Sequence, residues 1–454
     1  MKNGQEFVGG MNSRATDKTE IAGSTRTSFL KKLLGRDDVG TGRFFKNQTY
    51  HHAVLRALNQ VATHGADISE VLQATTRMQA GDEQNWFAEW TALGDRNLDR
   101  GRSVRNRQSR GEALLRAHTY YARAQFYLPW NDPKRPAAFD LSRKVFYEGL
   151  DTLGVAYDKI DVPYGANQLK AVYYPAPNPI AGPLIVFCGG YDSIVEELYF
   201  FLAASATSRG YSVLTFDGPG QGAPLREQGL HFTHEWEKPT SAVLDAFLAN
   251  HSQPEKMVLI GMSMGGYLAP RAAAFESRID GVVSYDIAYD MQAAFMSTVP
   301  RFLKLLQRIG LRNLADHIAK FASRSNPSLR WALSNARWTF GSAGLLEMLD
   351  AVGPYTLDGV GDRIRQDVLI LAGAEDQFIP LNQVEKYQRV LVNARSITTK
   401  VYDHASGGHE HSQLGAPTLW QADFFDWIEE KFGTSRSPTL EMTINRTRPP
   451  TRVS

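Results

Sequence analysis

The sequence predicts an α/β fold with a mostly parallel sheet, preceded by a helical segment. From residue 184 onward, short apolar runs of strand length alternate with helical patterns, which is typical of parallel strands joined by right-handed crossovers. Residues 28–150, in contrast, contain no strand pattern and carry apolar residues at helical spacing. The 454-residue length and the hydrophobic content of 43% are sufficient for a decorated fold of this kind with a sizeable core.

Composition divides the chain into segments. The two ends are polar and poor in large apolar residues, so we expect them to be disordered. A helical stretch that interrupts the strand alternation is where such a fold places a lid. The predicted segments are a disordered N-terminus at 1–27, a helical N-terminal domain at 28–150, an α/β domain at 151–434 with a helical lid at about 290–362, and a disordered tail at 435–454.

The elements within these segments follow from the spacing of apolar residues. In the helical domain, Trp86, Trp90 and Leu93 lie on one helical face, and a second stripe runs from Leu114 to Phe126. A hairpin with the turn Gly165-Ala166-Asn167 opens the α/β domain. The predicted strands are 160–164, 169–174, 183–188, 212–217, 257–260, a run beginning at 368, and 398–402, and the helices expected in the lid include 302–311 and 331–338.

The apolar run from Met257 to Ile260 ends at Gly261-Met262-Ser263-Met264-Gly265. This is the G-x-S-x-G pattern of a nucleophile elbow, whose glycines leave room for a sharp strand-to-helix turn with the serine at its apex. Small residues after the motif open a helix, which we expect to be interrupted or kinked near Pro270. The strand before the motif and the helix after it predict Ser263 as a nucleophile.

The acid and the base of a triad should follow this nucleophile in the order serine, acid, histidine. Asp376 ends a later strand pattern, and catalytic residues of open parallel sheets lie at the carboxyl ends of strands. Glu375 beside it is the alternative acid. After the next strand, His404, His409 and His411 share one glycine-containing loop, and all three are candidates for the base.

Glycines also follow a buried-strand pattern at Gly189 and Gly190, where they let backbone N–H groups face a substrate carbonyl. We therefore predict an oxyanion hole formed by Gly190 and by the N–H of Met264, the residue after the nucleophile. The glycine-rich loop at 218–222 does not match the G-x-G-x-x-G dinucleotide fingerprint, and no helix pattern starts there. We interpret it as a tight loop at the sheet edge, and we expect no cofactor.

Composition excludes several other classes of function. The formal net charge is +2, from 50 basic and 48 acidic residues, which gives no overall attraction to nucleic acid or to an anionic membrane. The N-terminus lacks the apolar core of a signal peptide, and no run of about 18 apolar residues occurs, so we expect a soluble, cytoplasmic protein without nucleic-acid or membrane partners. Cys188 is the only cysteine and glycines break the three-histidine loop, so we expect no metal.

Four segments together carry a family resemblance; they are Gly189 to Glu197, Phe216 to Gly222, Gly261 to Gly266 and Gly408 to Gly415. Residues from about 40 to 432 resemble the α/β-hydrolases with an N-terminal helical domain. That group includes fungal hydrolases of polyketide pigment and fusarin-type clusters and the bacterial dihydroxypseudooxynicotine hydrolase. The resemblance implies an α/β-hydrolase fold with a mostly parallel sheet, an N-terminal helical domain and a helical lid.

The resemblance also implies roles for single residues. In the family pattern the histidine is followed by Cys and Gln, and His411 occupies that position, with Ser412 where the cysteine is usual. His409 falls on a variable position. Family members carry an acid two places after the Gly-Gly pair, here Asp192, which either acts on substrate protons or only holds its loop. Tyr191 and Asp192 are the predicted substrate-binding residues.

Members of this group attack a carbonyl and stabilise a tetrahedral oxyanion. We predict a serine hydrolase that cleaves a C–C bond next to a ketone, a retro-Claisen step, in an aromatic or polyketide-like small molecule. An ester or thioester hydrolase, or an acyltransferase or cyclase with the same triad, is the alternative. A non-enzymatic binding module is the third class, and such modules usually lose a triad member. A homodimer is also expected, although the sequence leaves the oligomeric state open.

Overall fold

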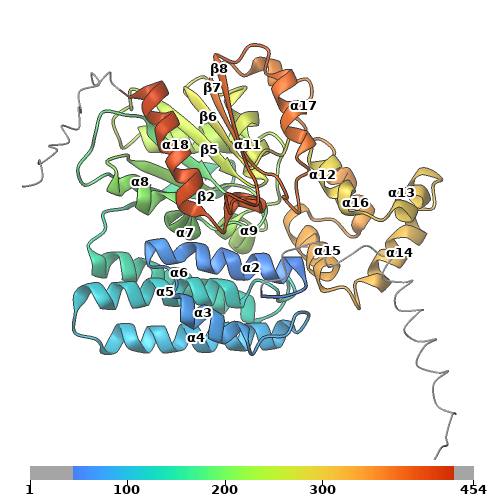
Figure 1. Cartoon of the computed structure of the whole chain (residues 1–454), viewed down its shortest axis with the longest axis horizontal. Coiled ribbons are helices and arrows are strands. Elements are labelled where there is room, and N and C mark those ends of the chain that lie inside the picture. Colours follow the sequence, from blue (N-terminus) through green and yellow to red (C-terminus); the bar gives the residue numbers. More distant parts are fainter. Residues whose placement is uncertain (1–43, 434–454) are drawn as a thin grey trace, which may run out of the picture.

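The computed structural model describes residues 44–433, so the two segments predicted to be disordered, 1–27 and 435–454, lie outside the described residues. A sheet with helices on both faces forms one part of the molecule (Figure 1). A layer of N-terminal helices packs below it, and a group of lid helices lies to the side. The α/β fold class predicted from the sequence is confirmed.

The helical layer is built from amphipathic helices with polar caps. Asn47, Asp67, Asp82 and Asn106 each accept a backbone N–H from the first turn of the helix that follows, which satisfies donors that have no partner inside the helix. The helices are α2 (Gln48–Asn59), α3 (Ile68–Thr75), α4 (Glu83–Ser103), α5 (Arg107–Ala124) and α6 (Lys134–Leu153), with a 3-10 turn at Gln60–Thr63 after α2. Trp86, Trp90 and Leu93 are buried together, as their spacing predicts.

The sheet has the strand order β1-β2-β4-β3-β5-β6-β7-β8. The hairpin of β1 and β2 is antiparallel, β2 pairs antiparallel with β4, and all later neighbours are parallel. Strands β3 to β7 are buried along their whole length, which explains why most of them are rich in apolar residues. Strand β6 was not among the strands predicted from the sequence. The strands are β1 (Asp158–Tyr164), β2 (Asn167–Tyr174), β3 (Leu184–Cys188), β4 (Val213–Asp217), β5 (Met257–Met262), β6 (Gly281–Tyr285), β7 (Asp367–Gly373) and β8 (Ser396–Tyr402).

Two apolar cores hold the sheet. One lies between the sheet and α10, α11 and α17, and the other between the sheet, α8, α18 and the helical layer. The covering helices are α7 (Val195–Leu198), a π-helical turn (Tyr199–Ala203), α8 (Ala204–Ser208), α9 (Gly222–Gln228), α10 (Glu237–Leu248), α11 (Gly265–Ala273), α17 (Asn382–Val390) and α18 (Pro417–Phe432), with 3-10 turns at Gly361–Arg363 and His411–Gln413.

The structure corrects two details of the sequence interpretation. A helix, α9, does start directly after the loop at 218–221, although its sequence shows no helical periodicity. Its first four residues are buried against β2 and β4, so tertiary packing and not an amphipathic pattern stabilises it. Helix α11 also continues through Pro270 to Ala273 without interruption.

The lid lies between β6 and β7 and has a small apolar core of its own. Its helices are α12 (Met291–Thr298), α13 (Arg301–Arg308), α14 (Arg312–Ala322), α15 (Pro327–Phe340) and α16 (Leu345–Ala351), within the range of about 290–362 expected from the sequence. Among all described residues, no helix combines the length and the apolar character that a membrane crossing requires.

Candidate active site

Ser263 lies in a sharp turn between β5 and α11. Its backbone φ is +61°, a left-handed conformation that few residues other than glycine adopt. The N–H of Ser263 donates to the carbonyl oxygen of Tyr285 on the neighbouring strand (2.5 Å), which fixes the turn to the sheet. The turn therefore presents the Ser263 side chain at the carboxyl end of the central strands, on the wall of a cavity.

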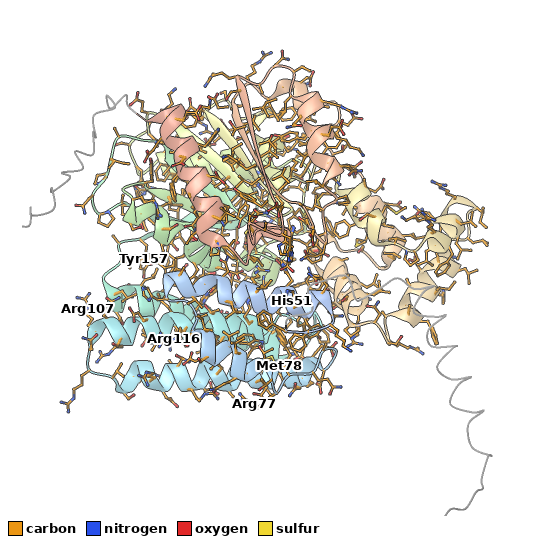
Figure 2. All side chains as sticks on the ribbon, in the orientation of Figure 1. His51, Arg77, Met78, Arg107, Arg116 and Tyr157 are labelled. Atoms are coloured by element: carbon orange, nitrogen blue, oxygen red, sulfur yellow. The ribbon has the colours of Figure 1, made fainter. Side chains whose placement is uncertain are left out.

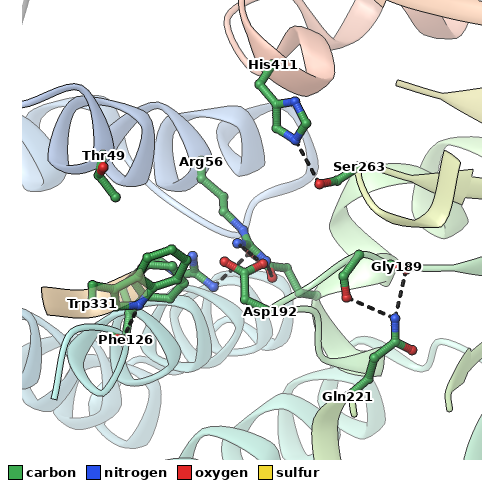
Figure 3. Close-up of polar contacts among 12 residues, drawn as sticks. Thr49, Arg56, Phe126, Gly189, Asp192, Gln221, Ser263, Trp331 and His411 are labelled. Carbon is green, nitrogen blue, oxygen red and sulfur yellow. Dashed lines mark hydrogen bonds and ion pairs between the residues drawn. The ribbon is translucent and has the colours of Figure 1, made fainter. Parts of the chain in front are cut away.

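A continuous hydrogen-bond chain runs from this serine to an acid. His411 Nε2 lies 2.8 Å from Ser263 Oγ (Figure 3), and His411 Nδ1 lies 2.6 Å from Asp376 Oδ2. Asp376 follows β7 and His411 follows β8, so three separate strand ends meet here. Since an ionised carboxylate only accepts hydrogen bonds, Nδ1 carries the proton and Nε2 directs its lone pair at the serine.

The charges around His411 favour its protonated form. Burial alone lowers the pKa of the imidazole, but the charge and hydrogen bond of Asp376, together with the charges of Asp286 and Asp192, outweigh that effect and raise the pKa above its usual value. This environment stabilises an imidazolium, which a general base becomes when it accepts a proton from a nucleophile.

Asp286 is a second buried acid at this histidine, and the sequence interpretation missed it. It follows β6, and its Oδ2 lies 3.3 Å from His411 Nδ1. It also accepts hydrogen bonds from the N–H of Ser412 and from Gln413 Nε2. Burial and the neighbouring Asp376 charge raise the pKa of Asp286 above its usual value, whereas the charge of His411 lowers it. The rule that functional residues end parallel strands could have identified it, because Asp286 directly follows an apolar run.

The alternative acid and bases lie elsewhere. Glu375 is exposed, and it approaches His404 and His409, not His411. The ring nitrogens of His404 and His409 lie 3.3 Å apart. The structure thus joins Ser263, Asp376 and His411 and leaves Glu375, His404 and His409 in a separate group, whose nearest nitrogen and oxygen atoms lie within 4.8 Å of one another.

Gly190 lies where the oxyanion hole is predicted, against the turn of the serine. A side chain on Gly190 would come within 2.8 Å of Ser263 Cβ and 3.1 Å of the Met264 nitrogen, so glycine allows this close approach. Within residues 44–433, the N–H of Met264 has no hydrogen-bond acceptor. A free N–H at this position is available to a substrate oxygen.

Gln221, in the glycine-rich loop after β4, fixes the orientation of the Gly189 and Gly190 peptides. Its Nε2 donates to the carbonyl oxygens of Gly189 (2.8 Å) and Gly190 (2.9 Å), as Figure 3 shows, and its Oε1 accepts the N–H of Gly218 (3.0 Å). Nothing in the local sequence indicates this contact, because the two loops are about 30 residues apart and meet only at the sheet edge.

Asp192 is paired with a residue of the helical layer. Arg56 on α2 donates from Nη1 to Asp192 Oδ1 (2.7 Å) and from Nε and Nη2 to both oxygens of Glu197 (2.9 and 2.5 Å). Arg123 adds an ion pair with Glu197 (3.0 Å). Burial lowers the pKa of Arg56, but Asp192 and Glu197 more than compensate and raise it. Helix α2 therefore borders the site, and Figure 2, which labels His51 on this helix, shows α2 between the sheet domain and the other helices of the helical layer.

The site opens into a cavity of about 1280 Å³. Tyr191, predicted to contact substrate, lines it and packs against rings of the lid and of the loop after α9. The walls come from α2, from the strand-end loops and from the lid. Lining residues include Thr49, His52 and Arg56 from α2, Gly190, Ser263, Phe378 and His411 from the sheet domain, and Phe295, Leu303, Trp331, Leu333 and Met348 from the lid.

Known proteins resemble this chain over most of its length. A model of the alpha/beta hydrolase family matches residues 185–419. The hydrolase acrC of Aspergillus aculeatus is 30% identical over 431 residues, covering 87% of this chain and 99% of acrC. The 20-hydroxy-prefusarin hydrolase FUS2 of Gibberella moniliformis is 29% identical, with the same coverage. The crystal structure of 2,6-dihydroxy-pseudo-oxynicotine hydrolase shares the fold, with a TM-score of 0.63, 20% identity and coverage of 84% of this chain and 98% of that chain.

Proposed function

The chain belongs to the alpha/beta hydrolase family and is an enzyme, and on that premise we propose that it cleaves a C–C bond next to a ketone through a Ser263–His411–Asp376 triad. The observation that carries this proposal is the hydrogen-bond chain from Ser263 Oγ through both ring nitrogens of His411 to Asp376. In such a chain the imidazole accepts the serine proton while the carboxylate orients the ring and stabilises its positive charge.

The proposed reaction has two halves. Ser263 Oγ attacks the carbonyl carbon and gives its proton to His411, while the N–H of Met264 and the Gly190 loop bind the oxyanion. When the tetrahedral intermediate collapses, the C–C bond breaks, its electron pair leaves with the departing carbon as an enolate, and His411 returns the proton to that carbon. Water then hydrolyses the acyl-serine through the same base.

Asp192 takes a positioning role in this mechanism. Its Oδ1 is held by Arg56 Nη1 at 2.7 Å, so this oxygen is already engaged in an ion pair that fixes the carboxylate in its loop. Its Oδ2 has no protein partner among the described residues and can accept a hydroxyl of the substrate. Of the two roles predicted from the sequence, acting on substrate protons or holding the loop, the ion pair with Arg56 favours holding the loop.

A large, mostly apolar substrate of polyketide type suits the cavity. Pockets for small molecules usually measure about 300–1,000 Å³, and this one is larger, at about 1280 Å³. The lid contributes apolar side chains such as Leu303, Leu333 and Met348. One relative is named for 20-hydroxy-prefusarin. By analogy, we propose that the substrate of this chain is a ketone-bearing product of a biosynthetic pathway.

Ester or thioester hydrolysis, or acyl transfer, is the second candidate. The hydrogen-bonded serine and the free N–H of Met264 serve any carbonyl, whatever group leaves. In C–C cleavage the leaving group is a carbon that must be protonated, whereas ester or thioester hydrolysis releases no such carbon. Turnover of a panel of β-diketones beside aryl esters distinguishes the two candidates. A cytoplasmic location, a homodimer and the absence of a cofactor remain predictions of the sequence.

The triad is tested by substitution and active-site labelling. Ser263→Ala and His411→Ala should each lower turnover by roughly three or more orders of magnitude, because triad members act as a unit. The matched control is His409→Ala, which removes a neighbouring histidine that does not contact Ser263 and should cost far less. A fluorophosphonate should label the wild type and not Ser263→Ala. Retained turnover in Ser263→Ala would disprove the covalent mechanism.

A further inference from the structure

His52 is a titratable residue of the cavity wall that the proposed mechanism does not use. It lies on α2, one helical turn before Arg56, and lines the same cavity as Ser263. Its ring centroid is 5.7 Å from that of His411, and it meets the Phe378 ring edge-on at 5.4 Å. The helical layer thus places an imidazole beside the reacting groups.

The hydrogen bonds of Gln377 determine which nitrogen of His52 carries the proton. Gln377 Oε1 accepts the backbone N–H of His411 (3.3 Å), so its amide nitrogen is the end that faces His52, 3.1 Å from Nδ1. An amide nitrogen can only donate a hydrogen bond. His52 Nδ1 must therefore be the acceptor, and in the neutral ring the proton is on Nε2.

The surroundings keep this ring neutral. Burial lowers the pKa of His52 well below its usual value, and the neighbouring His411, Arg56, His51 and Arg123 lower it further. Its Nε2–H has no acceptor among residues 44–433, while the ring is partly exposed to the cavity. A neutral donor without a protein partner, on a residue that lines the cavity, is thus available to a bound substrate.

The sheet order places this donor opposite the oxyanion hole. Strand β3, which leads to Gly190, lies on one side of β5, whereas β6 and β7 lie on the other. His52 contacts Gln377 and Phe378, which follow β7. With the attacked carbonyl placed beside Gly190, the side of Ser263 towards His411 and His52 is left for the remainder of a β-dicarbonyl group.

We propose that His52 is a substrate-contacting residue whose neutral Nε2–H binds the second carbonyl oxygen, the one that becomes the enolate oxygen when the C–C bond breaks. The inference rests on the proposed function of Ser263. The electron pair of the broken bond is delocalised onto this oxygen, the Nε2–H stabilises it without transferring a proton, and His411 protonates the carbon to restore the ketone. A substrate without this second oxygen, such as a simple aryl ester, does not use the contact.

Three substitutions distinguish the Nε2 donor from the ring. The amide nitrogen of glutamine reaches about as far as Nε2, that of asparagine only as far as Nδ1, and phenylalanine keeps the ring without a donor. Loss of one donor to a developing oxyanion costs roughly 100-fold or more in rate, and we expect that loss for His52→Phe and His52→Asn on a β-diketone. His52→Gln should recover most of the activity. All three should hydrolyse an activated aryl ester and react with a fluorophosphonate nearly as the wild type does.

Thr49→Val is the matched control, since Thr49 lines the same cavity on the same helix and its substitution should affect both substrates equally. Wild-type β-diketone turnover in His52→Phe would overturn the inference, as would equal losses on both substrates, which indicate a structural role. The ¹⁵N shifts of the His52 ring test the tautomer without activity, and a protonated Nδ1 would also overturn it. Failure of the proposed function is recognised separately, by an unlabelled wild type or an active Ser263→Ala.

Discussion

The two walls that enclose the cavity, helix α2 and the lid, are attached to the rest of the molecule by different contacts. The α2 wall is held by the Arg56–Glu197 ion pair, whose side chains are 6% and 2% exposed. The corresponding ion pair of the lid joins Arg330 on α15 to Glu83 of the helical layer, and its side chains are 33% and 24% exposed. Both pairs link an arginine to a carboxylate across an interface, but only the first is removed from water.

This difference agrees with what each wall contributes to the site. Helix α2 supplies polar groups with fixed directions, among them His52 and Arg56, and a directional group is useful only if its helix is held in one place. The lid mainly supplies apolar surface, which binds substrate without strict geometry. We infer that α2 and the strand ends determine which bond reacts, and that the lid determines which side chain of the substrate fits.

The largest expected effect is on stability, from breaking the buried pair. Glu197→Ala leaves Arg56 and Arg123 buried without their shared partner, and we expect the free energy of unfolding to fall by about 3–5 kcal/mol. Glu83→Ala breaks the lid pair, which water screens, and should cost less than about 1 kcal/mol. Urea denaturation of both variants measures the difference. Equal losses would show that burial does not distinguish the two walls.

The next effect concerns substrate binding by the lid. Leu333→Ala removes apolar surface from the cavity, and because each lost methylene weakens binding, KM should rise by roughly 10-fold or more. We expect kcat to change little, because an apolar contact that binds the ground state and the transition state equally affects KM alone. Steady-state kinetics on a long-chain β-diketone provide the measurement. A kcat loss as large as that of His52→Phe would place the lid among the groups that promote the reaction.

The sequence could predict the site residues at the ends of strands, but not those on helix α2. Ser263, Asp376 and Gly190 could be predicted as site residues because each follows a strand, and strand ends are visible as the ends of apolar runs. Asp286 follows the same rule and could have been found. His52 and Arg56 on α2 could not be predicted, because a histidine and an arginine on an amphipathic helix give no indication of which domain they face. The pairing of Arg56 with Glu197 spans 141 residues and exists only after the layers pack.

The pH dependence of kcat/KM tests whether the carboxylates that raise the pKa of His411 all belong to the sheet domain. The base acts in its neutral form, and because nearby carboxylates raise its pKa above 6.5, kcat/KM should fall as the pH drops through that raised value. The attraction between protonated His411 and these carboxylates also stabilises the fold. This contribution is fully present below about pH 6.5 and is lost as the pH rises through the raised pKa of His411.

Asp286→Asn removes one of the charges that raise the pKa of His411, so the acid limb should move to lower pH. Glu347→Gln, an exposed acid on lid helix α16, is the control and should leave the profile unchanged. The pH profiles of kcat/KM for both variants decide the matter. A shift in Glu347→Gln as large as that in Asp286→Asn would show that the lid also contributes to the charge at the catalytic centre.

The smallest expected effect comes from the polar contact that joins the two walls directly. Ser328 at the start of α15 accepts hydrogen bonds from Asn47 Nδ2 (3.0 Å) and Thr49 Oγ1 (2.8 Å) at the start of α2. These groups are only partly buried, so water can replace the lost partner, and Ser328→Ala should cost about 1 kcal/mol or less of stability. Ser323→Ala, whose hydroxyl bonds only within its own helix turn, is the control. If Ser328→Ala destabilised the protein as much as Glu197→Ala, the lid would be held by directional bonds as firmly as α2, and the two walls would not differ in kind.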